Sequence, residues 1–259
     1  MQHVLVTGGT GDLGKSMTDH LLRENFEVSV LTSRESSLPG KDIVLFKGNL
    51  ATGSGLPTAA AGKDVIIHCA SDSKNFEQVD ILGTQNLLNS LRRENIRHFV
   101  YISIVGVDIA DYPYYRAKHI VEKMISASGI PYSIIRTTQF HSFILMMLES
   151  FLNRDARVLR IPGQMRFQSI DTNEVAERLV AQIDEPAGLL PNVGGPEVLC
   201  FEQMAKSYLD MSGTNAVSEV ADISGDRFEL FRSGINLCPE HAYGKTTWKS
   251  FLENNFKTA

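Results

Sequence analysis

The sequence predicts an α/β fold in which helices cover both faces of a doubly wound parallel sheet. Two observations carry this prediction. Short apolar runs rich in Val and Ile alternate with helical patterns along the first half of the chain. Three glycines, Gly8, Gly11 and Gly14, stand between the first such run and the first helical pattern. Parallel strands place their carboxyl ends along one edge of the sheet, so a ligand is expected there.

The expected strands are apolar nearly throughout, as in strands covered on both faces. They span residues 3–7, 27–33, 43–49, 64–71, 98–106 and 132–138. The first helical stripe consists of Leu13, Met17 and Leu21 at a spacing of four residues. Later stripes begin at Ile81 and Ala117. This alternation of strand and helix predicts the crossover connections of a parallel sheet.

The glycines have the spacing of a dinucleotide-binding loop. Gly8 permits the tight turn after the strand, and Gly11 lets the backbone approach a diphosphate without an intervening Cβ atom. Gly14 lets the helix lie close to the strand. The amino end of that helix offers N–H groups and a partial positive charge to an anion. The position between a first strand and a first helix is the context that gives the motif its meaning.

The end of the second strand bears on which dinucleotide binds. An NAD site usually has an acidic residue there for the ribose 2′-hydroxyl. This chain has Thr32, Ser33 and Arg34 instead, and a guanidinium can pair with a 2′-phosphate. Asp12 and Glu35 are negative charges nearby that weaken this preference. The expected cofactor is NADP(H), with NAD(H) as the alternative.

A candidate catalytic pair lies in the segment YPYYRAKHIVEK, residues 112–123. Tyr114 and Lys118 are four residues apart and share one face of a helix. A nearby ammonium stabilises a phenolate, and this can lower a tyrosine pKa of about 10 by roughly 1–3 units. Tyr114 can then protonate a carbonyl oxygen as hydride arrives, with Ser103 polarising the same carbonyl. Tyr115 is the competitor for this role.

The pattern changes after Thr138, where further helices are expected at residues 140–152, 169–183, 201–211 and 246–255. We expect a single domain over residues 1–259. Residues 1–138 form mainly the dinucleotide-binding core, and residues 139–259 form mainly a small C-terminal substrate-binding lobe. Phe140, His141 and Phe143 directly follow the last expected strand, so they are the candidate pocket residues.

Composition excludes several function classes. The net charge of −5 gives no general attraction to nucleic acid or to anionic membranes. Cys69, Cys200 and Cys238 are scattered, so neither a metal site nor a disulfide framework is expected. The apolar run at the start continues directly into a strand, so no signal peptide is expected. No apolar run is long enough for a membrane span. These features predict a cytoplasmic protein with no nucleic acid or membrane partner.

Several segments together resemble the atypical, NmrA-like branch of the short-chain dehydrogenase/reductase superfamily. TGGTGDLG (7–14) resembles its glycine loop, and VDILGTQNLLNS (79–90) its fourth helix. FVYISIVGVD (99–108) and YPYYRAK (112–118) resemble its serine strand and Tyr-x-x-x-Lys helix. IIRTTQF, VGGPEVL and TTWKSFL resemble later segments of bacterial members. The resemblance covers essentially the whole chain.

This resemblance implies a Rossmann-like fold, an NADP(H) preference and a substrate pocket between the sheet edge and the C-terminal lobe. It implies a catalytic set of Ser103, Tyr114 and Lys118. The implied cofactor-binding residues are Gly8, Thr10, Gly11, Asp12, Leu13, Gly14, Ser33, Arg34, Asn49, Leu50, Cys69, Ala70, Ser71 and Lys118. There are three departures. The interval between Ser103 and Tyr114 is compact. Asn49 stands where an Asp often lies near the adenine, and HCAS (68–71) replaces the usual Asn-Ala-Gly.

The function expected is an oxidoreductase in which NADPH gives a hydride to a small carbonyl, enone or quinone acceptor. The alternative is a redox sensor that binds NADP(H) without turnover, because fold alone does not decide function. Tyr114 and Lys118 favour the enzyme, and the replaced Asn-Ala-Gly segment favours the sensor or a looser reductase. The expected partner is a small-molecule hydride acceptor, and the expected state is a monomer or homodimer.

Overall fold

The structure is a computed structural model that describes residues 2–33, 42–92 and 94–257. The chain forms two compact units. The first, here called the sheet unit, comprises Met1–Ser103, Pro113–Ile135 and Thr172–Leu190. The second unit comprises Ile104–Tyr112, Arg136–Asp171 and Pro191–Ala259. The chain therefore crosses between the units more than once, and residues 172–190, expected in the C-terminal lobe, belong to the sheet unit.

The sheet has seven strands in the order β10-β6-β5-β4-β1-β2-β3. Their bounds are His3–Thr7 (β1), Glu27–Thr32 (β2), Ile43–Lys47 (β3), Val65–His68 (β4), His98–Ile104 (β5), Tyr132–Thr137 (β6) and Gly188–Leu189 (β10). Strand β1 pairs in parallel with both β2 and β4. The strand order therefore reverses between β1 and β4, which makes this the switch point where such folds bind ligands. The predicted fold class, a Rossmann-like parallel sheet, is confirmed.

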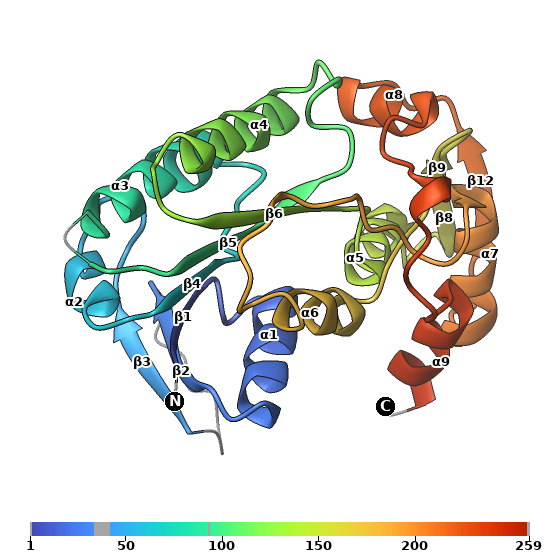
Figure 1. The fold of residues 1–259 in the computed structure, drawn as a ribbon. Coiled ribbons are helices and arrows are strands. Elements are labelled where there is room, and N and C mark those ends of the chain that lie inside the picture. The colour runs from blue at the N-terminus through green and yellow to red at the C-terminus, as the bar shows by residue number, and fades with distance from the viewer. Residues whose placement is uncertain (1, 34–41, 93, 258–259) are drawn as a thin grey trace. The chain divides into compact units, whose positions relative to one another are not determined.

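Helices cover both faces of the sheet (Figure 1). Helices α1 (Asp12–Arg23) and α6 (Thr172–Val180) lie on one face, joined by a 3.0 Å hydrogen bond between the hydroxyls of Ser16 and Thr172. Helices α2 (Leu56–Ala60), α3 (Gly83–Ser90) and α4 (Pro113–Ser126) lie on the other. A π-helical turn, Glu77–Leu82, leads into α3. The stripe Leu13, Met17 and Leu21 is buried as its spacing indicates, because it packs under the sheet.

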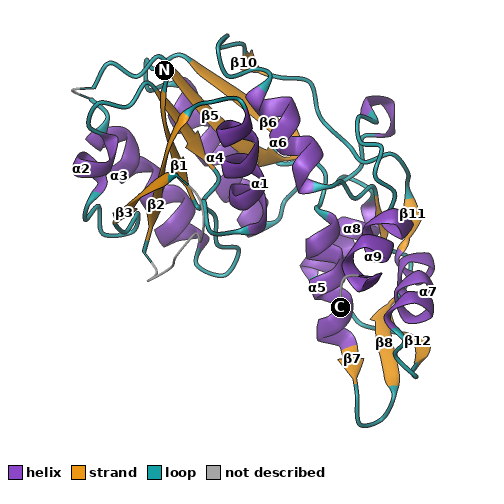
Figure 2. Ribbon diagram, turned by 90° about the horizontal axis from the view of Figure 1, so that it is seen from below, coloured by secondary structure: helices purple, strands orange, loops and turns teal. Residues whose placement is uncertain are grey.

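The second unit contains α5 (His141–Phe151), α7 (Phe201–Ser212), α8 (Asp226–Ser233) and α9 (Trp248–Lys257). Strand β8 (Val158–Pro162) lies between β7 (Leu152–Asn153) and β12 (Val217–Ala221), as Figure 2 shows. Strands β9 (Arg166–Phe167) and β11 (Leu199–Cys200) form a separate antiparallel pair. The ring centroids of Phe167 and Phe231 lie 4.7 Å apart in the core of this unit. No helix among the described residues is long and apolar enough to cross a bilayer.

A buried histidine ties three elements of the sheet unit together. The two ring nitrogens of His68, at the end of β4, contact the hydroxyls of Thr7 on β1 at 2.7 Å and Thr84 on α3 at 2.9 Å. A neutral imidazole has one donor and one acceptor nitrogen, which matches these two hydroxyls. Burial, together with the charge of Lys118, lowers the pKa of His68 to about 3. His68 is therefore neutral in the folded protein near neutral pH.

The fit of α1 against the glycine loop gives a first prediction. A Cβ atom at Gly14 would lie 2.2 Å from the carbonyl oxygen of Gly8, whereas one at Gly11 would meet only that oxygen, at 3.4 Å. We expect Gly14→Ala to destabilise the fold by about 1–3 kcal/mol, the usual cost of overpacking. Gly11→Ala, the matched control, should cost no more than about 1 kcal/mol. Urea unfolding of both variants measures this difference, and equal stabilities would contradict the packing argument.

His68 gives a second prediction, on the pH dependence of stability. Its pKa is lower in the folded chain than in the unfolded chain, so the unfolded state binds the extra proton. The contribution of His68 to stability is therefore constant above about pH 6.5 and falls as the pH drops from there toward 3, by about 1.4 kcal/mol per pH unit. We expect His68→Gln, which does not titrate, to show a shallower loss between pH 7 and 5. Denaturant unfolding across this range checks it, and identical slopes would show that His68 does not carry the effect.

Candidate functional site

A cavity of about 280 Å³ opens at the carboxyl ends of β1, β2, β3 and β4, on both sides of the switch point. It is lined by Gly8, Thr10, Gly11, Leu31, Thr32, Ser33, Gly48, Asn49, Leu50, Ala51, Cys69, Ala70, Ser71, Asp72 and Val79. Most of these residues end a strand or directly follow one. The cavity is thus built from the loops that the parallel topology brings to one sheet edge.

The glycine loop has the geometry that a diphosphate requires. Gly8 has φ +69°, and a Cβ atom there would lie 2.7 Å from the Cα atom of Ala70, so the loops after β1 and β4 touch. Gly11 is the N-cap of α1, and no side chain caps this helix end. The first turn of α1 therefore presents backbone N–H groups beside the cavity, with the positive end of the helix dipole behind them. These features fit a dinucleotide whose diphosphate lies at this helix end.

Many of the predicted cofactor-binding residues line this cavity. They are Gly8, Thr10, Gly11, Ser33, Asn49, Leu50, Cys69, Ala70 and Ser71. Asp12, Leu13 and Gly14 belong to the first turn of α1 and do not line it. Arg34 lies outside the described residues. Sequence reasoning missed Leu31, Thr32, Gly48, Ala51, Asp72 and Val79, although proximity to strand ends was a signal for all but Val79.

A hydrogen-bonded cluster connects this cavity to helix α4. The hydroxyl oxygens of Ser71, which lines the cavity, and Tyr114 are 2.7 Å apart. Ser71 also donates to Oδ1 of Asp80 at 2.5 Å, and the backbone N–H of Asp72 donates to Oδ2 of the same carboxylate at 3.0 Å. Tyr114 is half-buried, whereas Tyr115 is 3% exposed and packs in the core. The structure thus distinguishes the two tyrosines by exposure and by contact with the cavity lining.

Lys118 is 4% exposed and lies one helical turn beyond Tyr114 on α4. Its ammonium donates to the backbone carbonyl of Ile102 at 2.9 Å and lies 4.4 Å from the centre of the Tyr101 ring. Its nitrogen is 3.8 Å from Oδ1 of Asp80, which forms a buried ion pair. Burial lowers the pKa of Lys118, while Asp80 works in the opposite direction. No pattern in the sequence links this carboxylate to the lysine.

Two hydroxyls on β5 have no hydrogen-bond partner in the structure. Ser103 and Tyr101 are two residues apart on this strand, and each is 1% exposed. The Ser103 Oγ and the Tyr101 hydroxyl oxygen are both buried without a partner. A buried hydroxyl without a partner costs free energy, so a ligand that reached Ser103 would recover part of that cost. This fits the carbonyl-polarising role predicted for Ser103.

Cys69 follows β4, lines the cavity and lies close enough to Lys118 to feel its charge. Burial raises the pKa of its thiol to about 12, while Lys118 acts in the opposite direction. The thiolate is the reactive form of cysteine, so this thiol is unreactive at neutral pH. Cys69 therefore contributes shape to the cavity lining rather than nucleophilic chemistry.

The three candidate pocket residues belong to the second unit. His141 is 1% exposed and uses both ring nitrogens, toward Ser169 Oγ at 2.8 Å and the carbonyl of Thr246 at 3.0 Å. Its ring also stacks on Phe251, so His141 is a packed core histidine. Phe140 and Phe143 are partly exposed at the start of α5, so their role in a substrate pocket stays a prediction.

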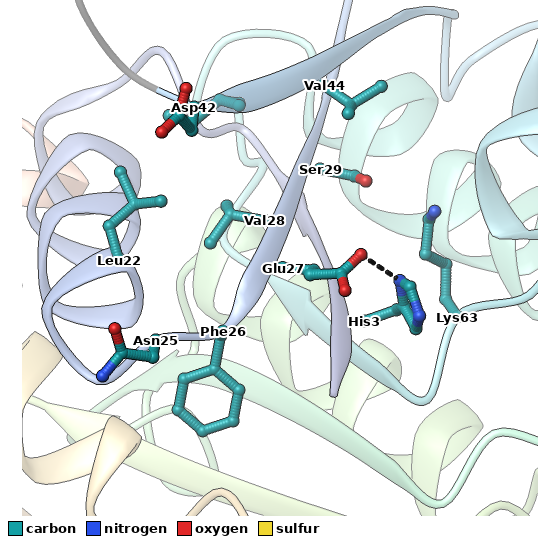
Figure 3. A pocket seen from close by; sticks show the side chains of 11 residues that line it. His3, Leu22, Asn25, Phe26, Glu27, Val28, Ser29, Asp42, Val44 and Lys63 are labelled. Carbon is teal, nitrogen blue, oxygen red and sulfur yellow. Dashed lines mark ion pairs between the residues drawn. The ribbon is translucent and has the colours of Figure 1, made fainter. Parts of the chain in front are cut away.

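A second hollow of about 710 Å³ lies at the opposite, amino-terminal edge of the sheet (Figure 3). His3 and Glu27, the first residues of β1 and β2, form an ion pair of 3.0 Å in its wall. Neither the glycine loop nor the pair of Asp80 and Lys118 lines this hollow. Among the described residues, no group of His, Cys, Asp and Glu side chains is arranged to hold a metal ion. The chemistry-bearing groups therefore gather at the carboxyl edge.

Comparison with known proteins agrees with this geometry. The sequence model of the family described as NAD(P)H-binding matches residues 8–186. The chain is 24% identical over 228 residues to photosystem II assembly factor Ycf39 of Synechocystis sp., covering 84% of this chain and 70% of that protein. The protein of the same name from Trieres chinensis is 23% identical over 191 residues, covering 71% of this chain and 60% of that protein.

Among solved structures, the NADPH complex of the quinone oxidoreductase QOR2 from Escherichia coli has the same fold. The TM-score is 0.80 at 16% identity, with 98% of this chain and 99% of that chain covered. The matched family segment starts at Gly8 in the cavity wall and takes in strands β2 to β6, the pair of Asp80 and Lys118, and helix α6. The cofactor class predicted from the glycine loop is therefore confirmed, and the chain belongs to the family described as NAD(P)H-binding.

Proposed function

We propose that this chain is an NADP(H)-dependent oxidoreductase that transfers hydride to a small carbonyl, enone or quinone acceptor. One observation supports this above the others. Ser71 lines the cofactor cavity and holds the hydroxyl of Tyr114, while the ammonium of Lys118 lies buried on the same helix. A phenol with a proton to give and a fixed cation thus adjoin a cavity built for the dinucleotide. That is the set of groups that carbonyl reduction by hydride needs.

The residues of this chain divide the work between binding and proton supply. The loop after β1 and the amino end of α1 bind the diphosphate, and Asn49 and Leu50 border the same cavity from the loop after β3. The bound cofactor supplies the hydride. Tyr114 gives its proton to the carbonyl oxygen of the acceptor, and Ser103 donates to the same oxygen. Lys118 fixes a positive charge beside the reacting oxygen, where the developing negative charge is stabilised.

A redox sensor that binds NADP(H) without turnover is the second candidate. The curated relatives reported above carry the name of an assembly factor rather than of an enzyme. In addition, the ammonium of Lys118 is already occupied by a backbone carbonyl and a carboxylate. Oxidation of NADPH in the presence of a panel of quinones, enones and aldehydes separates the candidates. Tight NADPH binding without turnover of any acceptor would favour the sensor.

The preference for NADP(H) gives a prediction. The second strand ends in Thr32 and Ser33, without an acidic residue for a ribose 2′-hydroxyl, and Arg34 follows. We expect NADPH to bind more tightly than NADH, and Arg34→Ala to remove most of the difference, about 1.5–3 kcal/mol for a charge-assisted contact. Arg23→Ala, an exposed change of equal charge on α1, is the control. Calorimetry showing equal affinities in the wild type would rule the preference out.

The catalytic role of Tyr114 gives another prediction. Tyr114→Phe removes one hydroxyl and leaves the cavity lining intact, so NADPH affinity should barely change. Carbonyl reduction should fall about 10²–10⁴-fold, the usual contribution of a general acid. A quinone should be less sensitive, because an electron-poor acceptor needs less acid assistance. The measurements are kcat/KM with an aldehyde and with a quinone, and Kd for NADPH.

Two further variants complete this experiment. Tyr115→Phe is the matched control, because Tyr115 adjoins Tyr114 but packs in the core. It should keep carbonyl reduction within a few-fold of wild type. Lys118→Ala should damage both catalysis and NADPH binding. Full carbonyl reduction by Tyr114→Phe, or a large loss in Tyr115→Phe alone, would move the acid role away from Tyr114.

A further inference from the structure

We propose that Asp80 is a positioning residue which, through the hydroxyl of Ser71, directs the proton of Tyr114 and opposes the ionisation of Tyr114. This inference rests on the proposed function, because it concerns the group proposed there as the acid. It follows from the contacts of a single buried side chain with the loop after β4 and with α4.

The direction of the hydrogen bonds follows from the acceptors. The carboxylate of Asp80 can only accept, so the hydroxyl of Ser71, 2.5 Å from Oδ1, donates to it. Ser71 has a single proton, which this bond uses. The bond of 2.7 Å between Ser71 and Tyr114 is therefore donated by Tyr114. A chain of two hydrogen bonds thus runs from the phenol to a buried carboxylate, and a chain with a charged end polarises each bond in it.

The carboxylate is held so that it cannot turn away from Ser71. Asp80 is 1% exposed, on the π-helical turn before α3. Its other oxygen, Oδ2, accepts the backbone N–H of Asp72 at 3.0 Å. The side chain of Asp72 in turn accepts the backbone N–H of Lys74 at 2.9 Å, which holds the loop beside it. Ser71 therefore meets a fixed acceptor whenever the loop is in this conformation.

The charges around Asp80 pull Tyr114 in opposite directions. Lys118 on α4, 3.8 Å from Asp80, favours a phenolate nearby, whereas Asp80 disfavours one. Glu122 on the same helix is a second buried carboxylate, and both carboxylates raise the pKa of Tyr101 on β5 in addition to the effect of its burial. Asp72 lies beside Asp80 on the loop after β4. Asp80 has a hydrogen-bonded connection to Ser71 and through it to Tyr114.

The test is the titration of Tyr114 itself, in the full chain without cofactor. The protein is labelled with ¹³C at the tyrosine Cζ, and the Tyr114 signal is identified by its loss in Tyr114→Phe. Asp80→Asn keeps the shape of the side chain and removes its charge. We expect the midpoint of the Tyr114 titration to move to lower pH by about one unit. A shift to higher pH, or no shift, would overturn the proposal.

The route through Ser71 is tested with Ser71→Ala, an exposed change that leaves the pair of Asp80 and Lys118 in place. In the Ser71→Ala background, Asp80→Asn should move the Tyr114 midpoint by less than half as much as in the wild type. Any change in the protonation of Lys118 occurs in both backgrounds and cancels in this cycle. An equal shift in both backgrounds would show that the charge acts through space and would overturn the route. Glu122→Gln is the control, and its effect should not depend on Ser71.

Activity gives an independent readout. If Tyr114 is the acid, the basic limb of the pH profile for aldehyde reduction should move to lower pH in Asp80→Asn, in step with the titration. Absence of turnover with every acceptor would contradict the proposed function, but it would not change the result of the Tyr114 titration. A turnover that depends on Tyr114, with a titration midpoint unaffected by Asp80→Asn, would overturn only the role of Asp80.

Discussion

The close approach of α1 to the loop after β1 is the constraint on which the site depends. The position of a Cβ atom at Gly14, 2.2 Å from the carbonyl oxygen of Gly8, shows that the helix touches backbone there. Gly8 in turn touches the backbone after β4 at Ala70. These two contacts need no side chain and tolerate none. They bring the amino end of α1 and the loops after β1 and β4 to one point, and the cavity is the space that remains beside them.

The face of the sheet beneath α3 and α4 carries a group of buried polar side chains. Thr7, His68 and Thr84 satisfy one another, whereas Ser103 and Tyr101 leave hydroxyls without a partner. Burial of polar groups in an otherwise apolar core costs free energy unless they are paired. These groups lie close to the cavity, which fits a site whose polar side chains serve its chemistry.

The pair of Asp80 and Lys118 gives this cluster its electrostatic character. A lysine buried alone would lose its proton readily, since burial lowers its pKa, and a carboxylate beside it counteracts that loss. The same carboxylate accepts from Ser71 and therefore affects the groups that border the cavity. One side chain thus balances the charge of the lysine and connects it to the loop after β4.

The sequence by itself determined the architecture and most of the residues that line the cavity at the carboxyl edge of the sheet. The alternation of strand and helix predicted the parallel sheet, because parallel strands are connected by crossover helices. Strands buried on both faces are also apolar, as these are. The glycine spacing predicted the loop, because only glycine tolerates the close backbone contacts at Gly8 and Gly14. The helix with Tyr114 and Lys118 was located by a spacing of four residues, which is a property of the local backbone. These features depend on residues close together in the chain, so the sequence predicts them.

Only the tertiary structure decided which groups contact one another. Ser71, Asp80, Tyr114 and Lys118 come from three separate segments, and no spacing in the sequence links them. Asp80 lies in a segment whose sequence pattern indicates only an apolar helix stripe. Its burial results from the packing of α4 beside the π-helical turn. Likewise, the enclosure of His141 depends on Ser169 and Thr246, far along the chain. Contacts between distant segments follow from the packing of the whole fold, which local patterns do not encode.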